Sequence, residues 1–322
     1  MERIAMSGRG ATAWSSRRRA LRHEWRRNKL LFLLLLPGTL YLFINNYLPM
    51  FGIVIAFKQV NFTKGIWNSP WNGFKNFDYL FSSTDTFLIT RNTVLYNLLF
   101  IVLGTVIAIA FAALLGELRR RFLVTLFQSM MFFPYVLSFV VVSYLGFAFL
   151  SIEHGFINNH LLKPLGFDAI EWYNDPRYWP YILTLVYLWK NLGYSTIIYM
   201  AAIIGIETSY YEAAVMEGAS KWQQFTSITL PLLKPVIIIL TVLGIGKIFF
   251  ADFGLFYLVP LASGPLYPTT LVIDTQVYNV LRLHNDIGMA AAVGLYQAAI
   301  GFLLVLLSNT IIRKVSKENA LF

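Results

Sequence analysis

The stretch EAAVMEGASKWQQFTSITLP, at residues 212–231, is a polar segment between two long apolar runs. It stands out because 57% of the chain is hydrophobic and only 13% is charged. Soluble domains carry about 25% charged residues, so this composition indicates that lipid surrounds most of the chain. The segment is therefore expected to be an organised loop outside the bilayer, and its chemistry decides which kind of membrane protein this is.

Six apolar runs are long enough to cross a bilayer, since a spanning helix needs about 20 mostly apolar residues. They are residues 30–57, 93–116, 126–150, 179–204, 236–259 and 287–312. The sequence thus predicts an all-α integral membrane protein with six transmembrane helices. The first run is longer than the apolar core of a cleaved signal peptide, which has about 7–15 residues. Pro37 and Pro49 within it predict a kink or an early end.

The distribution of basic residues predicts the orientation. Six spans place both termini on one side, and that side holds 17 of the 26 Lys and Arg residues, nine of them within residues 1–29. The other side holds seven, while Lys190 and Lys247 lie inside spans. Cytoplasmic loops carry the excess of Lys and Arg, so both termini and residues 212–231 are expected in the cytoplasm. The loops assigned to the outside are rich in Trp and Tyr, which favour the membrane interface.

Composition also excludes several functions. The chain has no cysteine, which excludes disulfides and thiolate chemistry. Its four histidines show no metal-binding spacing; they are His23, His154, His160 and His284. The net charge of +10 reflects a basic cluster beside the first apolar run, as in a juxtamembrane segment, so no nucleic-acid partner is expected.

Two capping boxes organise the polar segment. Residues 209–212 read S-x-x-E and residues 220–223 read S-x-x-Q, and each pattern predicts the start of a short helix. Gly218 between them predicts a left-handed turn. The loop also carries an apolar stripe, made of Tyr211, Val215, Trp222 and Phe225. An exposed stripe of this kind usually binds a protein. Two simpler interpretations stay open: the hairpin rests on lipid headgroups, and Glu212 serves only as a capping residue.

The same segment resembles a known signature. EAA at residues 212–214, Gly218, and I-x-L-P at residues 228–231 match the pattern E-A-A-x3-G-x9-I-x-L-P at every fixed position. This is the EAA motif of permease subunits in bacterial ABC importers. Glu217 is a small departure, because Asp is common before the glycine in that family, but it keeps the charge.

Other segments extend the resemblance to most of the chain from residue 30 onward. Residues 47–62, 73–81 and 286–297 are similar to the carbohydrate branch of the family, which handles complex oligosaccharides. The resemblance implies a MetI-like ABC permease fold in the bacterial cytoplasmic membrane, with both termini in the cytoplasm. It divides the chain into a basic cytoplasmic arm at 1–29, a first transmembrane helix with an outer interfacial segment at 30–90, a permease core at 91–313 containing the coupling loop at 205–234, and a cytoplasmic tail at 314–322.

In that family the loop couples the permease to a separate ATPase. The resemblance assigns this contact to Glu212, Ala213, Ala214 and Gly218. It also implies a second permease subunit, an ATPase dimer that binds ATP and Mg, and an extracytoplasmic solute-binding protein. This chain is expected to bind no cofactor or metal and not to be an enzyme. Its nearest approach to a phosphate loop, GIGK at residues 244–247, lacks the G-x4-G-K-[ST] spacing.

Polar side chains within the predicted spans are candidates for the substrate path. They are Lys190, Asn191, Tyr194, Lys247, Asp252, Tyr296 and Gln297. Ionisable groups within a bilayer are costly and usually face a cavity or a partner. Lys247 and Asp252 are five residues apart, hence about 140° apart around a helix. Lysines in the path would indicate an anionic oligosaccharide, and the overall resemblance points to alginate-oligosaccharide permeases. Inter-helix bridges, contacts with the partner permease and ordinary lipid-facing aromatic residues stay open as alternatives.

Two other functions remain open. An ion-coupled secondary transporter often shows inverted repeats and paired interrupted spans, which this sequence lacks, and it would have no use for the polar loop. A membrane enzyme would need clustered acids, bases or nucleophiles at one depth. The predicted outer loop is the one plausible place for such groups, which are Glu153, His154, His160, Asp168, Glu171 and Asp175.

Overall fold

The computed structural model describes residues 27–82, 84–118 and 120–315. Within these ranges the chain is helical apart from its loops and one isolated antiparallel bridge between Lys58 and Trp71. Most of the predicted N-terminal arm and of the C-terminal tail lies outside the described residues. The structure confirms the predicted all-α membrane fold class.

The chain divides into two compact units, and the first is Met1–Ile55. It holds α2 (Lys29–Leu42), the π-helical turn η1 (Phe43–Tyr47) and most of the 3-10 helix η2 (Leu48–Phe57). The early end predicted at Pro37 or Pro49 is wrong, because one helical run passes both prolines. The change of helix type keeps backbone groups paired where a proline offers no N–H; the N–H of Leu48, for example, donates to the carbonyl of Phe43.

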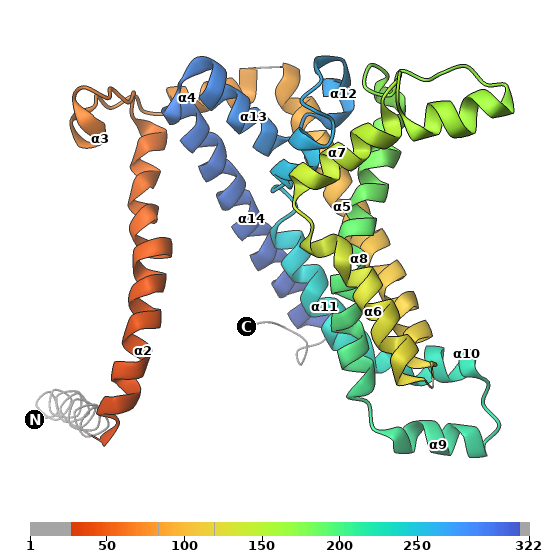
Figure 1. The fold of residues 1–322 in the computed structure, drawn as a ribbon. Helices are drawn as coiled ribbons and strands as arrows, with labels where there is room; N and C mark the ends of the chain where they lie inside the picture. The colour runs from red at the N-terminus through yellow and green to blue at the C-terminus, as the bar shows by residue number, and fades with distance from the viewer. Residues whose placement is uncertain (1–26, 83, 119, 316–322) are drawn as a thin grey trace, which may run out of the picture. The chain divides into compact units, whose positions relative to one another are not determined.

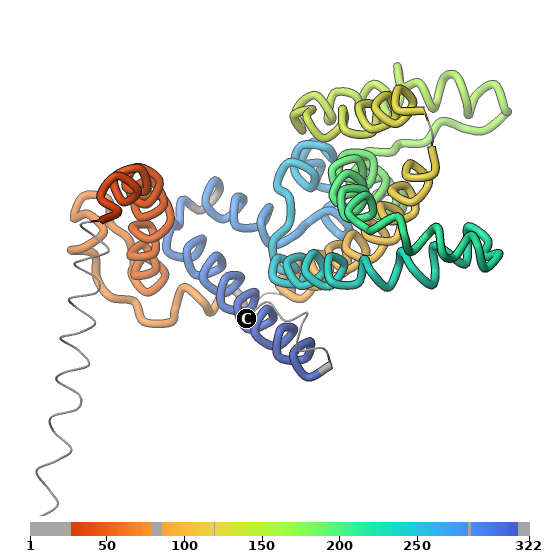
Figure 2. The backbone as a smooth tube through the Cα atoms, turned by 90° about the horizontal axis from the view of Figure 1, so that it is seen from below, coloured from red at the N-terminus to blue at the C-terminus, as the bar shows by residue number. Residues whose placement is uncertain are grey.

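The second unit, Ala56–Phe322, contains the long helices of the membrane core. They are α5 (Thr84–Gly116), α6 (Arg121–Val136), α8 (Trp179–Ile204), α11 (Leu230–Gly246) and α14 (Ile287–Val315) (Figure 1). In the second view, α5, α8 and α11 lie side by side (Figure 2). Among the described residues, four helices are long and apolar enough to span a membrane, or six if each of two bent pairs is one span. This agrees with the six predicted spans.

Small side chains allow α5, α8 and α11 to pack closely. Ala108 and Ala112 of α5 belong to one buried cluster with Tyr199 and Met200 of α8 and Leu233 of α11. In lipid there is little hydrophobic drive between helices, so close van der Waals packing at small residues holds them together. The large apolar side chains on the outer faces are exposed, as expected for surfaces that meet lipid tails.

The third predicted span, residues 126–150, is wrong as a single helix. α6 ends at Val136, and α7 (Phe139–Leu150) leaves it at an angle of 97°. Pro134 lies in the last turn of α6, and the Ser138 hydroxyl caps α7 by accepting a backbone N–H of its first turn. Proline next to a good capping residue favours a break over a continuous helix.

The fifth predicted span, residues 236–259, is displaced. The helical run extends from Lys221 to Gly246, residues 247–252 form no helix, and the short π-helix η7 (Gly254–Leu258) follows. Lys247 and Asp252 therefore lie on an irregular segment, and the separation of about 140° expected for a helix does not apply to them. Side chains from other helices form hydrogen bonds with the backbone of this segment, as described below.

Short elements connect the spans. They are α3 (Gly65–Asn68), α4 (Lys75–Ser82), η3 (Ile157–Leu162), η4 (Lys163–Leu165), η5 (Pro176–Tyr178), α9 (Thr208–Met216), α10 (Lys221–Gln224), η6 (Phe225–Thr229), η8 (Gly264–Leu266), α12 (Tyr267–Thr270), α13 (Ile273–Asn279) and η9 (Val280–His284). Figure 1 shows α9 and α10 at one end of the second unit, and α12 and α13 at the opposite end. This arrangement agrees with the prediction that the polar loop and the outer loops lie on opposite sides of the membrane.

Candidate functional site

The polar loop is a helix–turn–helix, as its punctuation predicts. α9 ends before Gly218, whose φ of +80° is left-handed, and α10 begins after the cap residue Ser220. The Gln223 N–H donates to the Ser220 hydroxyl at 3.3 Å, and the Ser220 N–H donates to the Gln223 side-chain oxygen at 2.7 Å. The second predicted capping box and the glycine turn are thus confirmed.

The first predicted capping box is wrong. α9 begins at Thr208, its cap residue is Glu207, and Ser209 lies within the helix. No side chain caps this end in the structure. Glu212 consequently has no capping role: its carboxylate is exposed and has no hydrogen-bond or ion-pair partner among the described residues. An unpaired carboxylate on an exposed helix is available to a partner protein.

The predicted apolar stripe is exposed in part. Val215 and Trp222 are exposed, whereas Tyr211 and Phe225 are half-buried against the rest of the loop. Met216, which the sequence interpretation missed, is 88% exposed and is the last residue of α9. Its position two residues before Gly218 was the available signal, because a side chain beside a predicted surface turn is expected to be exposed.

The loop is anchored to the membrane helices. The Lys221 ammonium lies 2.8 Å from the carboxylate of Glu117, just beyond the end of α5. The Tyr211 hydroxyl bonds the Thr229 hydroxyl at 2.8 Å, and the buried Gln224 amide donates to the carbonyl of Ala219. These contacts connect the hairpin to α5 through Glu117 and to α11 through Thr229, so a displacement of the hairpin would be transmitted to both helices.

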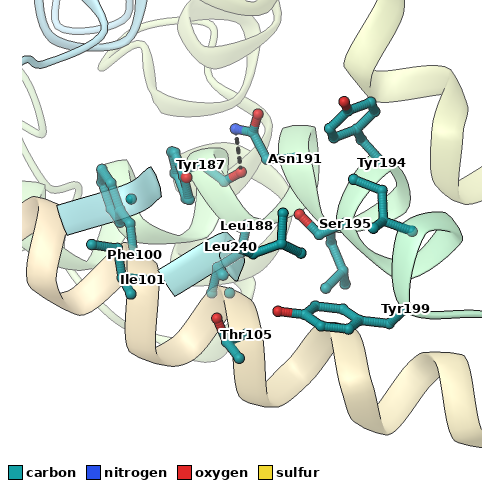
Figure 3. Close-up of a pocket in the computed structure, with 14 residues that line it drawn as sticks. Phe100, Ile101, Thr105, Tyr187, Leu188, Asn191, Tyr194, Ser195, Tyr199 and Leu240 are labelled. Carbon is teal, nitrogen blue, oxygen red and sulfur yellow. Dashed lines mark hydrogen bonds between the residues drawn. The ribbon is translucent and has the colours of Figure 1, made fainter. Parts of the chain in front are cut away.

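A cavity of about 200 Å³ lies between α5, α8 and α11 (Figure 3). Its polar lining includes Thr105, Tyr187, Asn191, Tyr194 and Ser195, and none of the described residues that line it is charged. The structure thus brings together two of the predicted path residues, Asn191 and Tyr194. The Asn191 amide donates to the Tyr187 carbonyl one turn earlier at 3.0 Å. Aromatic rings, hydroxyls and an amide are groups that can bind neutral polar rings such as sugars.

Lys190 does not line this cavity. It is 7% exposed, and its ammonium donates to the carbonyls of Pro134, Tyr135 and Leu137 at the break between α6 and α7. The ammonium also lies 4.8 Å from the centre of the Phe139 ring. Three donors meet three acceptors at the negative end of a helix dipole, and the ammonium forms no ion pair among the described residues. Lys190 therefore forms a bridge from α8 to the end of α6, which is one of the alternatives that the sequence left open.

Lys247 and Asp252 lie apart from the cavity as well. Both are exposed on the irregular segment after α11. The Asp252 carboxylate accepts the backbone N–H of Leu255 at 3.2 Å.

Tyr296 and Gln297 support the irregular segment. Gln297 is 3% exposed, and its amide donates to the Phe249 carbonyl at 2.8 Å and to the Asp274 carboxylate at 3.2 Å. Tyr296 packs edge-on against the Phe249 ring, with the ring centres 6.2 Å apart. Neither residue lines the cavity.

Asn97 and Asp274 were missed by the sequence interpretation. The Asn97 amide donates to the carbonyls of Ile248 and Phe250 at 3.1 and 3.0 Å, and the Asp274 carboxylate accepts the Ala251 N–H at 2.6 Å. An amide inside the apolar run of α5 was the signal that could have identified Asn97, since polar groups within a bilayer usually have a specific partner.

The outer-loop acids and histidines do not converge. Glu153 and His154 are exposed neighbours, with 3.8 Å between carboxylate and ring nitrogen. Arg177 donates hydrogen bonds to Asp175, which hold the pKa of that carboxyl below its ordinary value. Within the described ranges, no three His, Cys, Asp or Glu residues are grouped so that they could hold a metal ion.

Residues 101–317 match the family described as binding-protein-dependent transport system inner membrane component. This chain belongs to that family. It is 34% identical over 290 residues to the polygalacturonan/rhamnogalacturonan transport system permease protein YteP of Bacillus subtilis (strain 168), covering 90% of this chain and 89% of that protein. It is 31% identical over 293 residues to protein LplB of the same organism, covering 91% of each.

Solved structures give the same answer for the fold. A chain of the crystal structure of a bacterial ABC transporter involved in the import of the acidic polysaccharide alginate is 31% identical, with a TM-score of 0.83 over 92% of this chain and 99% of that one. A second structure, of the alginate transporter in complex with an alginate pentasaccharide-bound periplasmic protein, gives 30% identity and a TM-score of 0.81.

Family membership decides between the functions that the sequence left open. The protein is a permease subunit of an ABC importer in the bacterial inner membrane, which excludes the secondary transporter and the membrane enzyme. Permeases of this family work in general with another permease and an ATPase, and one structural neighbour is held in a complex with a periplasmic binding protein.

Proposed function

We propose that this chain is one of two permease subunits of an ATP-driven importer for acidic oligosaccharides. It forms half of the translocation path, and its α9–α10 loop binds a separate ATPase dimer in the cytoplasm, which holds the ATP and Mg. An extracytoplasmic solute-binding protein delivers the cargo on the opposite side. The excess of basic residues on the side of the loop supports this orientation.

The exposed hairpin is the observation that carries the proposal. Glu212 offers a free carboxylate, Ala213 is exposed without a bulky side chain, and Met216 and Trp222 are exposed apolar side chains. Resting on lipid headgroups requires no rigid hairpin fixed to Glu117. Transmitting a movement of a bound ATPase to the membrane helices does require one. We assign Glu212, Ala213, Ala214 and Gly218 to this contact.

The cavity and the relatives together support the cargo class. Tyr187, Asn191, Tyr194 and Ser195 provide rings and hydrogen-bonding groups for sugar units. The acidic character rests on the relatives, because polygalacturonan and alginate are both built from uronic acids. Lys190 gives no support to it, since its ammonium is bound to three backbone carbonyls.

The test is uptake by the importer reconstituted in vesicles with its partner permease, ATPase and binding protein. Wild type is expected to accumulate oligogalacturonides or alginate oligosaccharides only when ATP is present on the side of the membrane that carries the ATPase. Glu212→Ala removes the free carboxylate and is expected to lower this uptake at least about tenfold, the effect of losing one well-placed charged contact. The matched control is Glu207→Ala, another exposed glutamate of the same loop, which is expected to stay within about twofold of wild type. Equal uptake by Glu212→Ala and wild type would remove the coupling assignment, and ATP-independent uptake would remove the function.

A further inference from the structure

A group of three aromatic rings and one arginine lies outside the cavity. Phe253 and Tyr257 stack with ring centres 4.7 Å apart and an angle of 16°. The Tyr278 ring meets both of them edge-on, at 4.9 and 5.0 Å. Arg282 donates from its guanidinium to the Tyr257 hydroxyl at 3.0 Å. We call these four residues the aromatic–arginine platform.

The arginine of the platform has an uncompensated charge. Arg282 is exposed, and in the part of the chain that the structure describes it forms no ion pair. The nearest acid in sequence to the rings is Asp252, whose carboxylate accepts the Leu255 N–H and forms no ion pair with Arg282 among the described residues. By contrast Arg177, another exposed arginine of the predicted outer side, is already paired with Asp175. Arg282 is therefore free to bind an external anion.

The rings are fixed by the packing of the elements that carry them. The opposite face of η7 is buried through Leu255, Phe256 and Val259 in the main core cluster. The segment that carries Tyr278 and Arg282 is anchored by the buried side chains of Ile273 and Val280. The rings themselves are half-buried, so part of each ring is accessible. A preorganised surface loses little conformational entropy when a ligand binds.

We propose that the aromatic–arginine platform is a binding subsite for one uronate unit of the cargo. The apolar C–H face of a pyranose ring lies on an aromatic ring, and the uronate carboxylate pairs with the guanidinium of Arg282, whose planar fork matches a carboxylate. This inference rests on the proposed function, because it takes the cargo to be an acidic oligosaccharide. It adds a site for the charge, which the uncharged cavity between α5, α8 and α11 lacks.

The position of the platform indicates when it acts. It is built from η7, α13 and η9, and Figure 1 shows α13 at the end of the second unit opposite to α9 and α10. With the coupling loop in the cytoplasm, the platform meets the cargo on the side from which it enters. It then selects for the carboxylate before the sugar reaches the neutral cavity.

The test is equilibrium binding of trigalacturonate and of its methyl ester to the purified permease–ATPase complex without the binding protein. The ester keeps the rings and removes the charge. Wild type is expected to bind the acid about three- to tenfold more tightly than the ester, in the range of one charge-assisted contact that remains partly hydrated. Arg282→Gln is expected to abolish this preference while leaving the affinity for the ester unchanged. Tyr278→Leu is expected to weaken both ligands equally, and the control Arg177→Gln to change neither.

Several results would overturn the inference. One is a wild type that binds neither ligand or shows no preference for the acid. Another is an Arg282→Gln variant that keeps the preference. A third is an Arg282→Gln variant that loses the second permease during purification, which would make the platform a subunit interface. ATP-driven uptake by the full importer is measured in parallel. Uptake of acidic cargo with no charge preference at the platform removes this inference alone, whereas no uptake of acidic cargo removes the proposed function.

Discussion

Two interruptions of helical structure have opposite origins in this chain. The turn at Gly218 in the coupling loop is made by its own neighbours: Ser220 and Gln223, three residues apart, exchange hydrogen bonds across the start of α10. The irregular segment after α11 is instead held by distant groups, since Asn97 reaches its carbonyls from 151 and 153 residues away. The turn at Gly218 is stabilised by residues close to it in sequence and is exposed to water. The irregular segment after α11 forms only when the fold brings its distant partners together.

The difference follows from the solvent. In water a freed carbonyl is hydrated, so a surface turn needs only a compatible residue such as glycine. At membrane depth each unpaired backbone group costs several kcal/mol, so irregular backbone persists only where side chains replace the lost bonds. Asn97 and Gln297 bind the carbonyls of Ile248, Phe249 and Phe250. Lys190 does the same for the break between α6 and α7.

The largest expected effect comes from Lys190→Met. The substitution keeps the apolar stem and leaves three buried carbonyls without their donor, so the free energy of unfolding is expected to fall by about 3 kcal/mol. The matched control is Lys247→Met, an exposed lysine, which is expected to change it by less than about 0.5 kcal/mol. Midpoints of thermal unfolding of the purified complex measure both. Equal midpoints for the two variants would show that the bend at α6 does not depend on Lys190.

Asn97→Leu is expected to have the next largest effect. It removes the donor of two carbonyls in the irregular segment and lowers the free energy of unfolding by about 2 kcal/mol. Asn191→Leu is the control, because the Asn191 amide bonds only a carbonyl of its own helix, and a loss of less than about 1 kcal/mol is expected. If the two asparagines prove equivalent in thermal unfolding, the irregular segment does not need a distant partner and the comparison with the surface turn fails.

Ser220→Ala is expected to have the smallest effect on stability. Loss of the capping box costs about 1 kcal/mol and is confined to α10, so the unfolding of the membrane core should not change measurably. Local opening is expected to rise instead, which hydrogen exchange at the amide of Gln223 reports. The conservative variant Ser220→Thr should restore protection. A lowered midpoint of the whole core with Ser220→Ala would show that the hairpin is not an independent local structure.

The sequence could predict what is encoded nearby. The number of apolar spans, the left-handed position of Gly218 and the capping box at Ser220 each depend on one continuous stretch of sequence, and all three are confirmed. The box at Ser209 failed because α9 starts two residues earlier than that cap predicts, at Thr208, with Glu207 as a cap residue whose side chain makes no capping bond. Motif spacing added the family, since the EAA pattern is specific.

Partners across the fold could not be predicted. Lys190 was identified as a costly charge inside a span, but its acceptors are backbone carbonyls more than fifty residues away, which carry no sequence signal. The continuous third and fifth spans were expected because hydropathy measures solvent preference and not helix continuity. The aromatic–arginine platform likewise joins Phe253 to Tyr278 and Arg282 from two separate elements.

The central claim is that the α9–α10 hairpin is held by a separate ATPase at the inner face of the membrane. The chain has no cysteine, so Ala213→Cys creates a unique attachment point for a photo-crosslinker on an exposed residue of α9. In membranes carrying the assembled importer, the account predicts that labelling succeeds only with access to the cytoplasmic side and that the captured neighbour is the ATPase subunit. Labelling from outside intact cells, or capture of no nucleotide-hydrolysing subunit at this position, would contradict it.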